Sequence, residues 1–176
     1  MNTGPLLVLV GAPGAGKTTV GRRVARELDV PFADSDEMIE RQAGKSVAEI
    51  FIDDGESAFR SLEREAIARA LVESTGVLAL GGGAVLDPAT REALGGHTVI
   101  WLRVGISAAS DRVGMTASRP LLLGNVRGTL IRLLDERTPL YEEVASACVD
   151  TDGIDEGEVA HRVLEIIPGG SRAVSQ

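Results

Sequence analysis

The sequence predicts a three-layer α/β/α domain, in which helices cover both faces of a central, five-stranded parallel sheet. An apolar run over residues 6–10 leads into a glycine-rich turn and then into apolar residues at helical spacing. Residues 76–80 form a continuous apolar run, which is typical of a strand buried on both faces of a parallel sheet. Strand-like and helix-like segments then alternate along the chain, as they do in parallel α/β folds.

The length and composition predict a single domain. A chain of 176 residues with 44% hydrophobic content is long enough for one full core and too short for two ordinary domains. We expect this domain to span residues 1–167. Pro168, Gly169 and Gly170 end the last predicted helix, so residues 168–176 are expected to form a flexible tail.

The charge and the cysteine content limit the possible partners. A net charge of −8 argues against nucleic acid or an anionic membrane as the main partner, and requires local positive charge for any anionic substrate.

The first apolar run ends at Gly11 with no basic residue before it, which predicts neither a signal peptide nor a membrane span. The only cysteine, Cys148, lies in an apolar run and is expected to be a buried strand thiol. We therefore expect a cytoplasmic protein and, without an exposed apolar stripe, a monomer.

Residues 11–18 fit the pattern G-x-x-x-x-G-K-[ST] between a strand and a helix, which predicts a phosphate-binding loop. Gly14 and Gly16 have no Cβ, so the backbone can curl and present its N–H groups to phosphate oxygens. Lys17 is placed as a point charge for the β- and γ-phosphates of ATP, and the Thr18 hydroxyl as a ligand for Mg²⁺. The residues expected to bind the nucleotide here are Gly14, Ala15, Gly16, Lys17, Thr18 and Thr19.

Asp34, Ser35 and Asp36 follow a short extended segment and allow two interpretations. They can cap the next helix, because Asp and Ser are good N-cap residues. Alternatively, both carboxylates face the phosphate loop, provided that the chain stays extended through them. We favour the second, with Asp34 on the Mg²⁺ side through water and Asp36 on the acceptor hydroxyl, because ligands collect at the carboxyl edge of open α/β sheets.

Arg60 lies on a long helix expected over residues 56–73, at the border of its apolar face. Taken alone, it is best interpreted as an ordinary helix pair with Glu56 or Glu63, worth about 0.2–0.5 kcal/mol. The residues expected on the buried face are Phe59, Leu62, Ala66, Ile67, Ala70 and Leu71.

Gly81, Gly82 and Gly83 follow the strand at residues 76–80. Three glycines can form a flexible turn, but they also let a ligand approach bare backbone N–H groups. We favour the ligand because this strand is expected in the same sheet as the phosphate loop.

The second half of the chain predicts a lid. A short helix over residues 87–94, a strand over 99–102 and a helix over 106–113 precede residues 114–126, which lack periodicity but include three leucines. A further helix leads into the segment 137–141, and a strand at 147–150 and a helix at about 155–167 follow. His97 and His161 form neither a metal cluster nor a catalytic pair, so histidine chemistry is not expected.

These residues together resemble the shikimate kinases, small P-loop enzymes of aromatic amino-acid biosynthesis, over about residues 6–167. The resemblance implies a P-loop kinase fold with a mobile lid at about residues 114–126. It is based on an ordered set of motifs after the phosphate loop: Asp34-Ser35-Asp36, Gly44-Lys45-Ser46-Val47-Ala48-Glu49-Ile50-Phe51, Phe59-Arg60, Gly81-Gly82-Gly83-Ala84, Arg119-Pro120-Leu121-Leu122 and Arg137-Thr138-Pro139-Leu140-Tyr141.

The resemblance implies a substrate site for shikimate. In the family, the aspartate that matches Asp36 contacts the ring hydroxyls, and the arginines that match Arg60 and Arg137 clamp the carboxylate. The resemblance therefore changes the interpretation of Arg60 from an ordinary helix pair to a substrate contact. A planar guanidinium suits a carboxylate bidentately, so two arginines let an acidic protein bind an acid. The implied substrate residues are Asp36, Arg60, Gly81, Gly82, Gly83 and Arg137.

The resemblance also implies the reaction, which is transfer of the γ-phosphoryl group of MgATP to the 3-hydroxyl of shikimate. Arg119 would come from the lid to the phosphoryl group and Arg112 would stack on adenine, while Lys17, Asp36 and Arg119 form the catalytic set. Family members often have a proline beside adenine after the last strand, but residues 152–156 contain none.

A small P-loop kinase for gluconate or a nucleoside monophosphate is the alternative enzyme. A non-catalytic nucleotide-binding module is the alternative of another class, against which a lid arginine argues.

Overall fold

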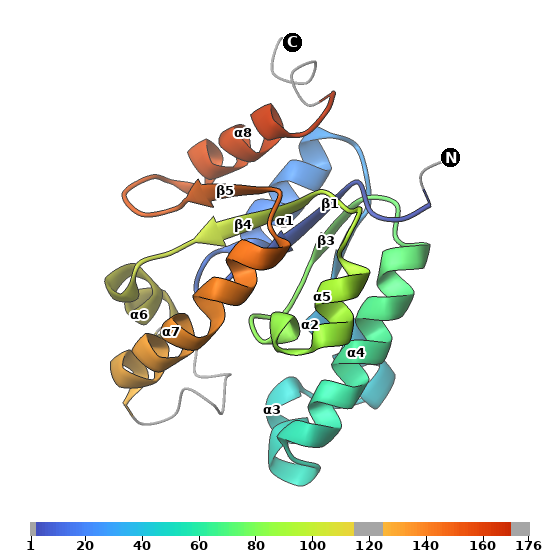
Figure 1. Ribbon diagram of the computed structural model, residues 1–176, viewed down its shortest axis with the longest axis vertical. Coiled ribbons are helices and arrows are strands. Elements are labelled where there is room, and N and C mark those ends of the chain that lie inside the picture. The colour runs from blue at the N-terminus through green and yellow to red at the C-terminus, as the bar shows by residue number, and fades with distance from the viewer. Residues whose placement is uncertain (1–2, 115–124, 170–176) are drawn as a thin grey trace.

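The computed structural model describes residues 3–114 and 125–169 and shows the predicted parallel sheet (Figure 1). Five strands pair in the order β2-β3-β1-β4-β5, and every pair is parallel. The three-layer α/β/α prediction is confirmed. The strands are β1 (Leu7–Val10), β2 (Phe32–Asp34), β3 (Val77–Ala79), β4 (Val99–Arg103) and β5 (Ala147–Asp150).

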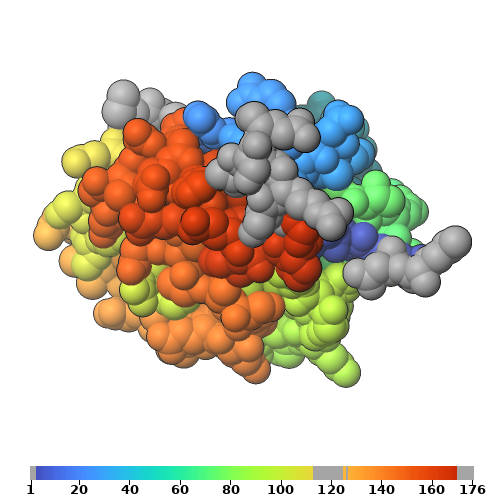
Figure 2. Space-filling view, turned by 90° about the horizontal axis from the view of Figure 1, so that it is seen from above, coloured from blue at the N-terminus to red at the C-terminus, as the bar shows by residue number. Residues whose placement is uncertain are grey.

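Helices cover both faces of the sheet. α1 and α8 pack against each other on one face, as Figure 2 shows from above, and α4, α5 and α7 cover the other. The helices are α1 (Lys17–Glu27), α2 (Ser35–Ala43), α3 (Val47–Asp53), α4 (Glu56–Glu73), the 3₁₀ turn η1 (Ala84–Leu86), α5 (Pro88–Ala93), α6 (Ile106–Gly114), α7 (Val126–Val144) and α8 (Glu156–Ile166). None of the described helices is both long and apolar enough to cross a membrane.

The core explains why these segments form strands. All four residues of β1 are buried, as are all three of β3, because both strands lie inside the sheet with helices on either side. A second, smaller core cluster lies between α2, α3 and α4 and contains Ile39, Ile50, Phe59 and Ala66. It anchors the helices that carry the acidic and basic side chains of the site.

Cys148 is exposed, so the prediction of a buried thiol is wrong. β5 pairs only with β4 and forms one edge of the sheet, and its successive residues alternate between a more buried and an exposed face. Of its four residues, only Val149 is buried. The apolar run predicted the strand but not which face Cys148 occupies.

The helix before residues 137–141 does not end there. α7 continues to Val144 with Pro139 inside it, although proline lacks the N–H that an interior helix position donates. Arg137 and Tyr141 lie four residues apart and are both buried, so they lie on the same, inward face of α7. Tertiary packing of this face outweighs the local cost of Pro139.

The predicted lid lies mostly outside the described residues. Of residues 114–126, Gly114 ends α6, and Asn125 caps α7 before Val126. Arg119 is among the residues that the structure does not describe, and so is the predicted tail beyond Gly169.

Candidate active site

The phosphate loop follows β1 and has the conformation that its glycines allow. Gly14 and Gly16 have φ values of 83° and 90°, which residues with a Cβ rarely adopt. Gly16 is the N-cap of α1 and provides no side-chain hydrogen bond to the first turn. The N–H groups of that turn are therefore left to bind an anion at the positive end of the helix dipole.

The side chain of Lys17 folds back against the backbone of the phosphate loop. This side chain is buried, and Nζ donates to the carbonyl oxygens of Gly11 at 2.7 Å and Ala12 at 3.0 Å. These bonds hold the ammonium group beside the loop backbone, where a bound phosphate would lie.

Asp34 performs both of the roles that the sequence left as alternatives. Its Oδ1 accepts hydrogen bonds from the backbone N–H groups of Asp36 at 2.9 Å and Glu37 at 3.3 Å, so it caps α2. Its Oδ2 accepts from Thr18 Oγ1 at 2.8 Å. One carboxylate thus starts a helix and faces the phosphate loop at the same time.

Asp36 lies in the first turn of α2, so the assumption of an extended chain through Asp36 is wrong. The capping bonds of Asp34 start the helix immediately after the strand. Asp36 nevertheless faces the glycine run after β3, because a Cβ at Gly81 would lie only 2.7 Å from its Oδ1. A cavity of about 260 Å³ is lined by residues of the phosphate loop together with Asp34, Asp36 and Gly81.

Each glycine of the run 81–83 leaves room for a different group. An added Cβ would meet Asp36 and Glu63 at Gly81, the ring of Pro13 at Gly82, and the guanidinium of Arg60 at Gly83. None of the three needs a positive φ. The run is therefore glycine because of close packing, and the Gly81 N–H itself donates to Ser35 Oγ at 2.9 Å.

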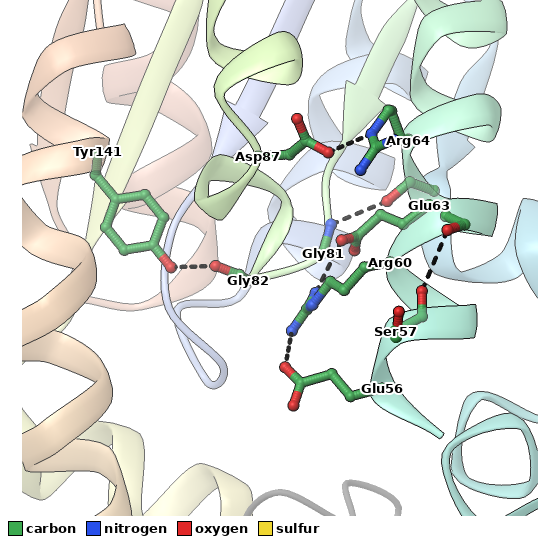
Figure 3. A network of polar contacts seen from close by, with 11 residues as sticks. Glu56, Ser57, Arg60, Glu63, Arg64, Gly81, Gly82, Asp87 and Tyr141 are labelled. Carbon is green, nitrogen blue, oxygen red and sulfur yellow. Dashed lines mark hydrogen bonds and ion pairs between the residues drawn. The ribbon is translucent and has the colours of Figure 1, made fainter. Parts of the chain in front are cut away.

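Arg60 makes the helix pair that its spacing predicts and also reaches the glycine run (Figure 3). Its Nη1 lies 2.8 Å from Glu63 Oε1, and its Nη2 lies 3.5 Å from Glu56 Oε1. The two interpretations of Arg60 are compatible, because one guanidinium carries several donors.

Glu63 is the residue of this site that sequence reasoning missed. It is only 3% exposed, whereas Leu62, expected on the buried face, is half-buried. Burial raises the pKa of Glu63, while the charges of Arg60 and Arg137 oppose the rise. The i,i+3 spacing from Arg60 was the available signal, but it did not distinguish an exposed pair from a buried one.

Arg137 is a buried cation without a paired anion among the described residues. It is 3% exposed, its Nε is buried without a hydrogen-bond partner among the described residues, and its charge acts on Glu63 to lower the pKa of that carboxyl. Arg60 Nε and Glu63 Oε2 are likewise buried without a described partner. Burying a charge without a partner is costly, so this cluster is suited to receive an anionic ligand.

A larger cavity of about 710 Å³ lies on the other side of the phosphate loop. Arg112 lines it and donates from Nη1 to the carbonyl oxygen of Gly14 at 2.8 Å. Thr19 from α1 and Ile154 from the connection after β5 also line it. This cavity has the size and the position for a nucleoside next to phosphates on the loop.

The residues beside the loop fit Mg²⁺. Within the described part of the chain, no cluster of three or more His, Cys, Asp or Glu residues is arranged to hold a metal. Mg²⁺ does not need one, because it keeps several waters and binds one or two protein oxygens together with substrate phosphates. Thr18 Oγ1 and Asp34 Oδ2 supply such oxygens.

The fold and the site define a P-loop kinase: a phosphate loop follows the central strand, and a pocket at the same sheet edge is lined by the loop together with Asp34, Asp36 and Gly81. The family model for shikimate kinase matches residues 13–168. The chain belongs to the shikimate kinase family, whose members are ATP-dependent kinases.

Two groups of relatives support this assignment. The shikimate kinases of Thermobifida fusca and Salinispora arenicola are 51% and 55% identical to this chain, over 96% and 93% of its length and 98% of theirs. The shikimate kinase of Acinetobacter baumannii, solved in complex with shikimate, has a TM-score of 0.89 and 37% identity over 93% of this chain and 92% of that one.

A gluconokinase of Sinorhizobium meliloti shares the fold, with a TM-score of 0.58 over 97% of this chain and 93% of that one, but only 21% identity. The gluconate alternative therefore has fold similarity alone in its favour. The family assignment likewise argues against a non-catalytic nucleotide-binding module.

Proposed function

We propose that this kinase transfers the γ-phosphoryl group of MgATP to the 3-hydroxyl of shikimate, using the residues that the sequence singled out. The observation that carries the substrate assignment is the buried, unpaired Arg137 beside the Arg60–Glu63 pair. Two guanidinium groups next to the glycine run suit a carboxylate better than a neutral sugar.

The donor half of the site binds the nucleotide through the phosphate loop. The N–H groups of residues 14–19 and the ammonium of Lys17 neutralise phosphate charge, and the larger cavity holds adenine and ribose between Arg112 and Ile154. Thr18 and Asp34 would hold Mg²⁺, which supplies further charge neutralisation when bound.

The acceptor half positions shikimate. Arg60 and Arg137 hold its carboxylate, and Asp36 accepts a hydrogen bond from the hydroxyl and orients it toward the phosphate loop. Phosphoryl transfer through a loose transition state depends mainly on positioning and charge, so orientation is the main role of Asp36. Arg119, outside the described residues, is proposed to stabilise the transferring group.

An acceptor panel tests the proposal. We expect ADP release from MgATP with shikimate and little with gluconate or a nucleoside monophosphate. In Arg60→Ala, the KM for shikimate should rise about 10- to 100-fold, as the loss of a charge-assisted hydrogen bond predicts. Arg64→Ala is the matched control, because Arg64 lies one turn further along α4 and pairs with Asp87 at the surface. No turnover with shikimate, or equal KM values in the two variants, would contradict the proposal.

A monomeric state and a cytoplasmic location stay predictions. Size-exclusion chromatography with light scattering measures the first directly, and a dimer mass would contradict it.

A further inference from the structure

Tyr141 is a buried residue of α7 that lies outside the proposed substrate contacts. It is 1% exposed and lies one helical turn after Arg137 on the same face. Its ring stacks on Trp101 of β4, with 5.8 Å between the ring centroids and 27° between the planes. Its hydroxyl donates to the carbonyl oxygen of Gly82 at 2.5 Å (Figure 3).

This hydrogen bond acts on the peptide between Gly82 and Gly83, whose own C=O and N–H make no backbone hydrogen bond among the described residues, although the Gly83 carbonyl accepts from the Leu86 N–H at 3.1 Å. The flanking groups of the glycine run are bonded, with Gly81 N–H on Ser35 and the Gly81 carbonyl on the Ala84 N–H at 3.1 Å. Between them, Gly82 and Gly83 have no side chains to resist rotation of the peptide that joins them. Tyr141 is the described group that bonds the Gly82 carbonyl.

Fixing the Gly82 carbonyl also fixes the direction of the Gly83 N–H. The peptide is planar and trans, so its C=O and N–H point in opposite directions. The Gly83 N–H is therefore directed away from Tyr141. Figure 3 shows Arg60 on the other side of the glycine run from Tyr141, and the Arg60 guanidinium packs directly against Gly83. No described group accepts a hydrogen bond from the Gly83 N–H.

We infer that Tyr141 is a positioning residue for recognition of the acceptor's carboxylate. Its hydroxyl holds the Gly82–Gly83 peptide so that the Gly83 N–H donates to the same carboxylate as Arg60. Tyr141 does not touch the substrate; it prevents rotation of the peptide that does. This inference rests on the proposed function, in which Arg60 and Arg137 bind that carboxylate.

The test compares two acceptors in two variants. Tyr141→Phe removes only the hydroxyl, and Trp101→Phe is the control that alters the same aromatic pair but keeps the bond to Gly82. The acceptors are shikimate and its primary alcohol analogue, in which CH₂OH replaces the carboxylate.

For Tyr141→Phe, we expect kcat/KM for shikimate to fall about five- to tenfold through KM, the loss expected for one hydrogen bond. The KM for ATP and the kcat/KM for the alcohol should stay within about twofold of the wild-type values, because neither ATP nor the alcohol uses the carboxylate contact. Trp101→Phe should keep the wild-type preference for shikimate.

Two results would overturn the inference while leaving the proposed function intact. One is an equal loss for both acceptors in Tyr141→Phe, which indicates general loosening. The other is an equal loss of preference in Trp101→Phe, which assigns the effect to packing. If the wild-type enzyme itself uses both acceptors equally well, the carboxylate clamp of the proposed function fails, and this inference fails with it.

Discussion

The donor and acceptor halves of the active site are built in different ways. The phosphate-binding part of the donor half is one continuous segment, residues 11–18, whose backbone N–H groups and one lysine are proposed to bind phosphate. The acceptor half combines side chains from α2, α4 and α7 with the glycine run after β3. A site made of backbone can be local, whereas a pocket lined with charged side chains needs neighbours to exclude water and to hold the charges apart.

Lys17→Met should have the largest effect and should affect the donor half alone. It removes the ammonium that neutralises the phosphates, so kcat should fall about 10²- to 10³-fold. The KM for shikimate should change little. Steady-state kinetics with both substrates varied measures this. The control is Lys45→Met, which removes the chain's other lysine, a surface partner of Asp54. A large rise in the KM for shikimate would show that the two halves are not separable.

Arg137→Met should affect the acceptor half instead of the donor half. It should weaken shikimate binding and make the fold more stable. The KM for shikimate should rise about 10- to 100-fold because a charge-assisted contact is lost. The free energy of unfolding should rise, because an apolar side chain replaces a buried cation that forms no direct ion pair with a described residue. Urea unfolding without substrate measures the second effect. Arg132→Met, an exposed site on the same helix, should show neither. A loss of stability in Arg137→Met would mean that Arg137 is already paired.

Gly83→Ala tests the packing role of the glycine run. A Cβ at Gly83 overlaps the guanidinium of Arg60, which is the far end of a flexible side chain and can move. The enzyme should fold, and the KM for shikimate should rise about tenfold, as in a milder form of Arg60→Ala. Gly95→Ala, outside the site, is the control. Unchanged kinetics in Gly83→Ala would show that the position of Arg60 against Gly83 is not needed.

Glu63→Gln should have the smallest effect and should show in the pH dependence of stability. Because burial raises the pKa of Glu63 above its usual 4.5, the folded protein holds this proton more tightly than the unfolded chain. The contribution of Glu63 to the free energy of unfolding should therefore fall as pH rises from below 4.5 through the raised pKa, and Glu63→Gln should lack this contribution. Urea unfolding between about pH 4 and pH 7 measures it, with exposed Glu65→Gln as control. Parallel curves for wild type and Glu63→Gln would contradict the raised pKa.

Much of the fold was predictable, because hydrophobic periodicity is a local property. Residues 56–73 were predicted as a helix with the bounds of α4, and the apolar runs predicted all five strands. The errors concern which side a residue faces. Cys148 is exposed on an edge strand, and Glu63 is buried on a face expected to be apolar. Both depend on which elements pack alongside, and nothing in the local pattern specifies that.

Asp34 shows the same limit within the site. The sequence presented capping of the next helix and facing the phosphate loop as alternatives, but one oxygen of the Asp34 carboxylate caps α2 and the other accepts a hydrogen bond from Thr18 of the loop. Pro139 is a related case, because local propensity ends a helix there and the buried face of α7 continues it.

The sequence by itself determined the phosphate-loop motif, the five strands in their order along the chain, and the family. These features depend on backbone conformation and on periodicity, which neighbouring residues specify. Only the tertiary structure decided that Arg60, Glu63 and Arg137 meet beside the glycine run, that each glycine there makes room for a different group, and that Tyr141 bonds Gly82. Those contacts join segments far apart in the chain, and they form only when the helices dock on the sheet and bury charges that water would otherwise solvate.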